Sequence, residues 1–431
     1  MKTPQKPVII AGAGPGGLTL ALLLHQRNIP VRVFESVQEI RPLGVGINLL
    51  PHSVRVFHNL GLQTLLTDSG IETSTLHFCN KFGQKIKSEP RGVRAGYNYP
   101  QISIHRGYFQ MLLHRETLAR LGNDSVLTGH ALKSWKDTAD GVKVTLQTRA
   151  GDGVGSEAGS EIGGGVGNEI EVEGCCLIAA DGIKSTARSI LYPAEGQPLY
   201  SGQILWRSTT EAEPFFDGRT MVMGGTYDQK FVCYPISKQH AEKGRSLINW
   251  IAELKVPEWT QLDQNWINEV SKDVFYEPFA SWKFDWLDVP ALINGATAIY
   301  QYPMTDRDPL PRWTHGNMTL MGDAAHPMYP IGSNGASQAV LDAEVLANEL
   351  ASADKSTHEA LEAYESVRRP ATSKIVLANR GEGPDIILNM ADERAPNGFE
   401  NIKDIISQAE FDQISSRYKQ TAGFAVKQVN G

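Results

Sequence analysis

The sequence predicts an α/β fold in which a mainly antiparallel β-sheet is inserted into a parallel-sheet domain. Three observations support this fold class. An apolar strand near the N-terminus runs into a glycine-rich turn and an apolar helix. Two further apolar strands, LIAADG at 177–182 and MTLMGD at 318–323, also end in turns that carry an aspartate. Between them, strand-like segments follow one another so closely that antiparallel pairing is the simplest arrangement.

Composition sets the limits of this prediction. The chain has 431 residues, a formal charge of −7, 41% hydrophobic and 21% charged residues. These values are ordinary for a folded protein with a large core, and they exclude disorder over the whole length. The negative charge gives no indication of a nucleic-acid-binding surface.

The N-terminal segment matches a dinucleotide-binding turn. The buried-strand pattern PVIIA at 7–11 leads directly into Gly12, Gly14 and Gly17, spaced as GxGxxG. The first glycine allows the tight turn, the second lets a pyrophosphate approach the backbone, and the third lets the next helix pack closely on the strand. The N-terminus of that helix attracts anions through its free amide groups and its dipole.

A carboxylate follows at the expected distance. The strand VRVFE ends at Glu35, 18 residues beyond Gly17, where an acidic residue accepts hydrogen bonds from ribose hydroxyls. Strand, glycines, helix, strand and carboxylate together predict a Rossmann-like domain that binds an adenine dinucleotide. This segment alone leaves NAD and FAD open.

The two later strands favour a flavin. Asp181 and Gly182 end one of them, and Asp323 ends the other, where ligands bind at the carboxyl edge of a parallel sheet. A helix that begins near Asn334 or Gly335 would direct its positive end toward the N1–C2=O edge of a flavin. For each aspartate a simple helix cap is the alternative interpretation.

Other cofactors and a membrane span are not expected. The chain contains no HExxH and no CxxC, so we predict no metal site. The apolar stretch 8–24 carries four glycines and a proline and is shorter than the ~20 apolar residues that a span needs. Four cysteines without a framework pattern suit a cytoplasmic location.

Taken together, these motifs resemble the single-component FAD-dependent aromatic hydroxylases of the para-hydroxybenzoate hydroxylase class, and within it the phenazine hydroxylases. The resemblance covers residues ~5–380. It is carried by AGAGPGGL at 11–18, RPLGVGIN at 41–48, EPRGVRAGYNYPQISIHRG at 89–107, AADGIKSTAR at 179–188, QYPMTDRDPLP at 301–311, GDAAHPMYPIGSNGASQA at 322–339 and YESVRRPATSKIVLANR at 364–380.

The resemblance implies how FAD is held. The three glycines would bind its pyrophosphate, Glu35 its ribose, Arg106 the ribityl-pyrophosphate side and Asp323 the ribityl chain, with Arg41 as a further phosphate contact. Backbone near Gly46 and in 330–336 would lie beside the isoalloxazine ring. The expected FAD-site residues are therefore Gly12, Gly14, Gly17, Glu35, Arg41, Gly46, Arg106, Asp181, Gly182, Asp323, Pro330, Gly332, Asn334, Gly335 and Ala336.

The resemblance also implies the reaction. NADH or NADPH reduces FAD, O2 adds at flavin C4a, and the distal oxygen of the hydroperoxide attacks a carbon of a planar aromatic or heteroaromatic ring, with or without loss of a ring carboxylate. No second dinucleotide motif is present, so NAD(P)H would bind transiently. A flavin oxidase, dehydrogenase or epoxidase with a non-aromatic substrate is the alternative from the same fold, and a flavin-binding sensor without turnover is a third.

The domain plan follows the order of the motifs. We expect an FAD-binding domain from 1–194 and 296–380, a substrate-binding sheet at 195–295, and a helical tail at 381–431 that could be a docking arm or an oligomer contact. The run 151–169 contains eight glycines and predicts a flexible hairpin extension.

Two polar residues of the inserted sheet are candidate catalytic residues. Arg207 follows Trp206, and Tyr234 precedes Pro235. In relatives of this class an arginine and a tyrosine near these places orient the substrate, and an arginine in a pocket pairs with a carboxylate through two hydrogen bonds.

Overall fold

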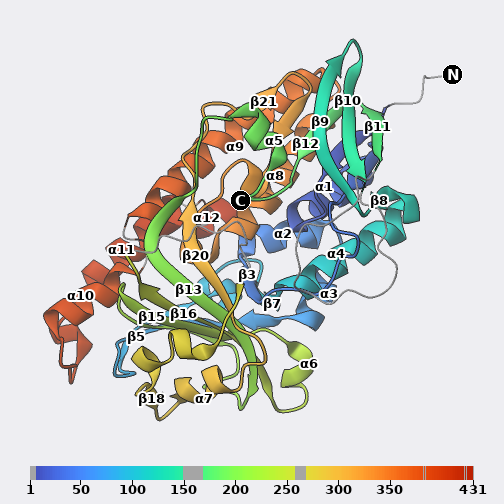
Figure 1. Ribbon diagram of the computed structural model, residues 1–431. Coiled ribbons are helices and arrows are strands. Elements are labelled where there is room, and N and C mark those ends of the chain that lie inside the picture. Colours follow the sequence, from blue (N-terminus) through green and yellow to red (C-terminus); the bar gives the residue numbers. More distant parts are fainter. Residues whose placement is uncertain are drawn as a thin grey trace.

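A computed structural model describes residues 6–148, 168–257, 268–381, 383, 385–421, 423 and 425–430. Within them the chain forms a helix-covered parallel sheet and a larger antiparallel sheet, which occupy the upper and lower halves of Figure 1. The hairpin extension expected at 151–169 falls outside the described residues, apart from 168 and 169. The strands on either side of it, β10 and β11, pair antiparallel.

The upper sheet has the strand order β21-β22-β12-β1-β2-β8 and is parallel except for β21. The central strand β1 is fully buried because helices cover one face of the sheet and the small sheet of β9, β10 and β11 covers the other, which explains its unbroken apolar sequence. The strands are β1 (Val8–Ala11), β2 (Val31–Phe34), β8 (Val126–Leu127), β12 (Cys176–Ala179), β21 (Thr314–His315) and β22 (Met318–Leu320). The three predicted motif strands are β1, β12 and β22, so their carboxyl ends meet at one edge.

Helices pack on this sheet through apolar faces. Helix α1 begins at Pro15, where the missing N–H costs nothing, and its residues from Gly17 to Leu24 are all buried. It packs against α8, and Ser356 and Glu359 form a capping box at the start of α9. The helices here are α1 (Pro15–Gln26), α2 (Pro51–Asn59), α3 (Gln63–Ser69), α4 (Arg106–Leu121), α5 (Thr186–Leu191), α8 (Gly335–Leu350) and α9 (Thr357–Arg380).

The lower sheet has the order β17-β20-β13-β16-β15-β14-β5-β6. The closely spaced strand-like segments between the later two motifs are β13 to β16, and they pair antiparallel in the order β13-β16-β15-β14. The sheet also takes β5, β6 and β20 from outside 195–295, and β14 pairs with β5 in parallel. Its strands are β5 (Thr75–Cys79), β6 (Lys85–Pro90), β13 (Leu199–Ala212), β14 (Thr220–Gly225), β15 (Gln229–Pro235), β16 (Ser246–Lys255), β17 (Asn268–Glu269) and β20 (Tyr300–Asp306).

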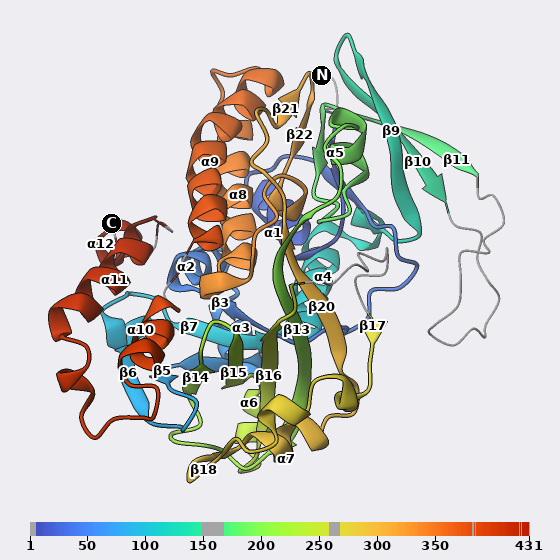
Figure 2. The same ribbon diagram turned by 60° about the vertical axis from the view of Figure 1, so that its left-hand side comes forward.

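Smaller elements join these layers. A sheet of order β3-β7-β4 lies between the two halves of the molecule (Figure 2). A second small sheet, β11-β10-β9, extends from the upper half. These elements are β3 (Gly46–Leu49), β4 (Ile71–Thr73), β7 (Gln101–His105), β9 (His130–Thr138), β10 (Gly141–Thr148), β11 (Glu169–Gly174), β18 (Lys283–Phe284), β19 (Leu287–Asp288), α6 (Lys238–Ala241) and α7 (Val289–Asn294).

The tail beyond residue 380 folds back as an arm on the β5–β6 end of the lower sheet, at the left of Figure 2. It contains α10 (Ile386–Arg394), α11 (Gln408–Thr421) and α12 (Val426–Asn430). Ile387, Leu388 and Phe411 pack in the same apolar cluster as Met221 and Met223 of the sheet. This C-terminal arm is therefore part of the core that covers the lower sheet.

The apolar stretch near the N-terminus forms β1 and α1 inside the core. Among the helices of the described residues, none combines the length and the apolar character required to cross a bilayer.

Candidate active site

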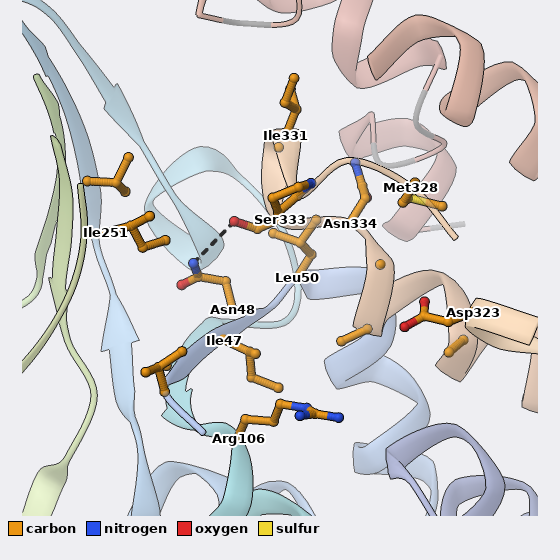
Figure 3. Close-up of a pocket in the computed structure, with 18 of the residues that line it drawn as sticks. Ile47, Asn48, Leu50, Arg106, Ile251, Asp323, Met328, Ile331, Ser333 and Asn334 are labelled. Atoms are coloured by element: carbon orange, nitrogen blue, oxygen red, sulfur yellow. Dashed lines mark hydrogen bonds between the residues drawn. The ribbon is translucent and has the colours of Figure 1, made fainter. Parts of the chain in front are cut away.

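A cavity of about 550 Å³ lies where the two halves of the molecule meet. Figure 3 shows Ile251 of the lower sheet and Asp323 of the upper domain on opposite sides of the same space, with Arg106 along one edge. The cavity wall draws on β3, on the turns after β1, β12 and β22, and on strands β13 to β16.

In the glycine turn after β1, two glycines lie in close backbone contacts and one faces open space. A Cβ on Gly12 would lie 2.3 Å from the carbonyl oxygen of Ala180, and one on Gly17 would lie 2.1 Å from that of Gly12. A Cβ on Gly14 would meet no protein atom within 4 Å, and Gly14 lines the cavity. Gly12 and Gly17 therefore allow close packing inside the protein, whereas Gly14 leaves open space on the ligand side.

Glu35 lies behind this turn. Its Oε2 accepts a hydrogen bond of 2.7 Å from the backbone N–H of Ala13, and its Oε1 accepts bonds from the Ser36 hydroxyl and the Val37 N–H. The carboxylate thus fixes the glycine turn against the end of β2. The remaining predicted arginine on this side, Arg41, is mostly exposed and pairs with Glu39, so it lies away from the cavity wall.

The turn after β12 separates its two predicted residues. Gly182 lines the cavity, and a Cβ on it would meet nothing within 4 Å. Asp181 instead accepts a hydrogen bond from the N–H of Ala187 at the start of α5, so its carboxylate acts as a cap. Burial raises the pKa of Asp181, and the hydrogen bonds from Ser185 and Ala187 oppose that rise.

A buried ion network supports the turn that carries Asp323. Asp342 of α8 accepts hydrogen bonds from the Gly322 N–H at 3.0 Å, from His326 Nε2 at 2.6 Å and from Arg368 Nε at 2.7 Å. Burial raises the pKa of Asp342, but His326 and Arg368 outweigh burial and lower it to about 2. The network fixes Gly322, and therefore Asp323, at the end of β22.

Asp342 is a functional residue that no sequence motif predicts. An isolated aspartate in the middle of a helix has no local pattern to mark it, although Arg368 lies inside one of the segments that carry the family resemblance.

The loop from Pro330 to Ala336 forms another side of the cavity. It contains two consecutive left-handed residues, Gly332 with φ 68° and Ser333 with φ 57°, before α8 begins. Ser333 accepts a hydrogen bond of 3.3 Å from the side chain of Asn48, the dashed line in Figure 3. Asn48 in turn accepts one from Ser103 of β7, so β3, β7 and the loop are joined beneath the cavity.

Gly46 is held by three side chains of the lower sheet. Arg207 Nη2 and Tyr234 Oη each donate a hydrogen bond of 3.0 Å to its carbonyl oxygen, and its N–H donates to Asn249 Oδ1 at 2.7 Å. A Cβ on Gly46 would lie 2.7 Å from the Cβ of Asn249, so only glycine fits. The structure thus brings Arg207 and Tyr234 together at one backbone group, and Asn249 joins them.

Neither candidate catalytic side chain is suited to proton transfer near neutral pH. Burial raises the pKa of Tyr234 to about 12, with Arg207 partly opposing the rise, so the phenol remains a hydrogen-bond donor. The guanidinium of Arg207 offers only hydrogen-bond donors and lies 5.9 Å from the ring centre of Tyr302.

The wall between Gly46 and the C-terminal arm is apolar. It presents Met221 and Met223 of β14, Val232 of β15 and Ile251 of β16. Cross-strand pairing places Met223 opposite Val232, and Val232 opposite Ile251, so these side chains form one row on the cavity face. Such a surface suits a flat apolar ring system.

A buried ion triad ends this wall. Lys230 of β15 lies between Glu253 of β16 at 2.9 Å and Asp385 of the C-terminal arm at 2.5 Å, and all three side chains are at least 94% buried. Burial lowers the pKa of Lys230, but the two carboxylates outweigh burial and raise it above the ordinary lysine value. The triad connects the arm to the sheet.

These residues fit a flavin dinucleotide. Gly14, Gly182 and Gly335 all leave open space where a Cβ would stand, at the carboxyl edge of the parallel sheet and at the N-termini of α1 and α8. Arg106 adds a cation at the same edge. Within the described part of the chain, no three His, Cys, Asp or Glu side chains are grouped so as to hold a metal ion.

Comparison with known protein families agrees with this geometry. The family described as "FAD binding domain" matches residues 5–379. The chain is 45% identical over 382 residues to "Phenazine 1,6-dicarboxylic acid hydroxylase PhzS" from Lysobacter antibioticus, with 87% of this chain and 89% of that protein covered. It is 31% identical to "Aurachin C monooxygenase/isomerase" from Stigmatella aurantiaca, with 84% of each chain covered.

Solved structures share the fold at lower identity. The HpxO protein of Klebsiella pneumoniae, complexed with FAD and uric acid, superposes with a TM-score of 0.70 at 21% identity over 98% of this chain and 96% of its own. A salicylate hydroxylase substrate complex gives a TM-score of 0.70 at 22% identity over 99% of this chain and 98% of its own.

Proposed function

Because this chain belongs to the FAD binding domain family, and within it to the FAD-dependent aromatic monooxygenases that consume NAD(P)H and O2, we propose that it hydroxylates a planar, fused heteroaromatic acid. The alternative of a flavin oxidase or epoxidase with a non-aromatic substrate has no feature of the cavity in its favour. A relative named for a phenazine dicarboxylic acid supports this substrate class.

One observation carries the proposal. On strands β14 to β16, the described cavity residues between Gly46 and the ion triad are all apolar, and those on facing strands lie in a row. A fused aromatic ring would bury an apolar face on such a wall, beside the site that these residues offer to a flavin. Because burial of apolar surface contributes ~25 cal/mol per Å², the ring would gain several kcal/mol of binding free energy without a polar contact.

We assign the FAD-site residues on the same basis. Gly14 and the start of α1 would hold the pyrophosphate, Arg106 would neutralise part of its charge, and Asp323 would accept hydrogen bonds from the ribityl chain. When bound, the flavin supplies the reduction of O2 and the transfer of one oxygen atom to the ring.

The protein supplies position and a dry environment. Arg207, Tyr234 and Asn249 fix the Gly46 peptide, which lies beside the expected ring of the flavin. We therefore propose Arg207 and Tyr234 as positioning residues. The apolar row next to them excludes water, which would divert reduced oxygen to peroxide.

A direct experiment tests this function. Purified protein loaded with FAD is screened with fused heteroaromatic carboxylic acids for ligand-stimulated NADH or NADPH oxidation, and the product is weighed by mass spectrometry. Addition of one oxygen atom, with or without loss of CO2, supports the proposal and separates the two possible outcomes for a ring carboxylate. Oxidation without oxygen insertion would instead indicate an oxidase or dehydrogenase.

Asp323→Ala provides the matching control for the cofactor. This variant should lose FAD on purification while it keeps the fold, because Asp323 is exposed in the cavity and outside the Asp342 network. A yellow variant with normal turnover would refute the role given to Asp323.

The four cysteines form no disulfide, which supports the proposed cytoplasmic location.

A further inference from the structure

The end of the cavity remote from the glycine turn is basic. Its wall contains Arg91, which follows β6, and Lys419 of α11, together with Glu89 and Gln101. Lys419 belongs to the C-terminal arm, beyond the residues that the family match covers. Two distant segments therefore place cations at the same end of one cavity.

These cations outnumber the carboxylates near them. Glu89 pairs with both Lys87, at 2.8 Å, and Arg91, at 3.3 Å. Among the described residues, no carboxylate lies within ion-pair distance of Lys419. Lys87 also donates a hydrogen bond to the backbone carbonyl of Phe411, and the cavity wall in this corner carries two cations, Arg91 and Lys419, beside one carboxylate, Glu89.

The corner is poorly solvated. The side chains of Lys87, Arg91 and Glu89 are 11%, 16% and 9% exposed, and Arg91 Nε is buried without a hydrogen-bond partner. Burial lowers the pKa of Lys419; Glu89 raises it, whereas Arg91 and Lys87 lower it further. Excess positive charge in such a place is costly unless an anion joins it.

The corner is connected through β7 to the 330–336 loop of the cavity. Gln101 is two residues from Ser103 on β7, about 7 Å along the strand. Ser103 pairs with Asn48 across the β3–β7 ladder, and Asn48 contacts the 330–336 loop. Across the lower sheet, Glu89 lies opposite Leu76, and Leu76 lies opposite Met221 of the apolar wall, so a ring system on that wall can extend toward the corner.

We propose that Arg91 and Lys419 form an anion subsite that binds the carboxylate of the aromatic substrate at the end of the cavity away from the glycine turn. Arg207, by contrast, already donates to the Gly46 carbonyl. This inference rests on the function proposed above and adds the position of the substrate's charged group. A phosphate group of NADPH offers the same charge, and the experiment separates the two sources.

The test measures ligand binding to the FAD-loaded enzyme. Phenazine-1-carboxylate and its neutral isostere phenazine-1-carboxamide are titrated against the flavin absorbance of wild type, Lys419→Met and Arg91→Gln. We expect the wild type to prefer the acid. Each variant should weaken acid binding about tenfold or more, the usual scale for one charge-assisted hydrogen bond, and should change amide binding less than twofold.

Lys403→Met is the matched control. Lys403 is exposed on the same arm, and its substitution removes the same charge outside the cavity. It should bind both ligands as the wild type does. The KM for NADPH and for NADH is measured in parallel. A rise confined to NADPH, with acid binding unchanged, would assign the subsite to the dinucleotide phosphate and overturn the proposal.

Two further outcomes separate the possible failures. If the wild type hydroxylates an aromatic acid but the preference for acid over amide survives in both variants, the subsite is refuted and the proposed function stands. If the loaded wild type binds neither ligand and no aromatic acid stimulates NAD(P)H oxidation, the proposed function fails and the subsite with it.

Discussion

The glycine turn offers a sharp prediction, since two glycines three residues apart should fail in opposite ways. Gly14 has φ −67° and ψ 172°, which alanine adopts freely, and its missing side chain would meet no protein atom within 4 Å. Gly17 would direct a methyl group to within 2.1 Å of the Gly12 carbonyl oxygen. Gly14→Ala should therefore fold and lose FAD, whereas Gly17→Ala should lose stability first.

The magnitudes follow from these contacts. The stability of apo Gly14→Ala should stay within about 1 kcal/mol of the wild type, because the change is a cap-position substitution without a clash. Its FAD affinity should fall by at least ~10-fold, since the methyl group blocks at least one charge-assisted hydrogen bond from the backbone to the pyrophosphate. Gly17→Ala should be destabilised by ~1–3 kcal/mol or more, the cost of overpacking against rigid backbone.

Two measurements check this pair. Urea unfolding of the apoproteins gives the free energy of unfolding, and quenching of FAD fluorescence gives the dissociation constant. Gly381→Ala, at φ −83° and outside the cavity, is the control for a simple loss of glycine and should change neither value by much. Gly14→Ala protein that binds FAD within about twofold of the wild type would refute the pyrophosphate site.

Three other side chains give predictions of their own. Tyr234→Phe removes one of two donors to the Gly46 carbonyl; it should uncouple NAD(P)H oxidation from product, measured as more peroxide per NAD(P)H, with FAD affinity within a few fold. Lys230→Met leaves two buried carboxylates unpaired and should cost ~3–5 kcal/mol in urea unfolding, with protease sensitivity appearing first in the arm. Asp342 has its pKa lowered to about 2, so its stabilisation is complete above pH ~4 and is lost as the pH falls toward 2. The gap in unfolding free energy between the wild type and Asp342→Asn should narrow over that interval, and a constant gap would contradict the ion network.

Local patterns predicted the parts of the fold that local chemistry determines. Strands β1, β12 and β22 are buried on both faces, so their sequences are apolar throughout and each ends in a turn of small or acidic residues. The GxGxxG spacing likewise reports backbone contacts within a few residues. The expected helix start near Asn334 or Gly335 is confirmed, since α8 begins at Gly335, whereas the FAD-site residues at the sheet edge stay a prediction.

Contacts between residues far apart in the sequence produce no such local pattern. The parallel contact of β14 with β5 joins residues about 145 positions apart, and the bond from Gly46 to Asn249 spans 203 positions. Asn249 sits in an apolar strand where it looks like an exception to the pattern, and only the fold shows which backbone group satisfies it. The position of the C-terminal arm could not be predicted for the same reason, since the Lys230–Asp385 pair that connects it to the sheet joins residues 155 positions apart.

The distribution of charge along the cavity explains why sequence motifs for acid–base catalysis are missing. Arg106 and Asp323 lie at the dinucleotide edge, and Arg91 and Lys419 lie in the corner beside β6 and α11. Between them stand an apolar row, a phenol with its pKa near 12 and a guanidinium already bonded to backbone. None of these middle groups can exchange a proton at neutral pH, so the protein must act on the ring by holding it in place against the flavin. Substitutions in the middle should therefore change coupling, whereas substitutions at the two ends should change binding.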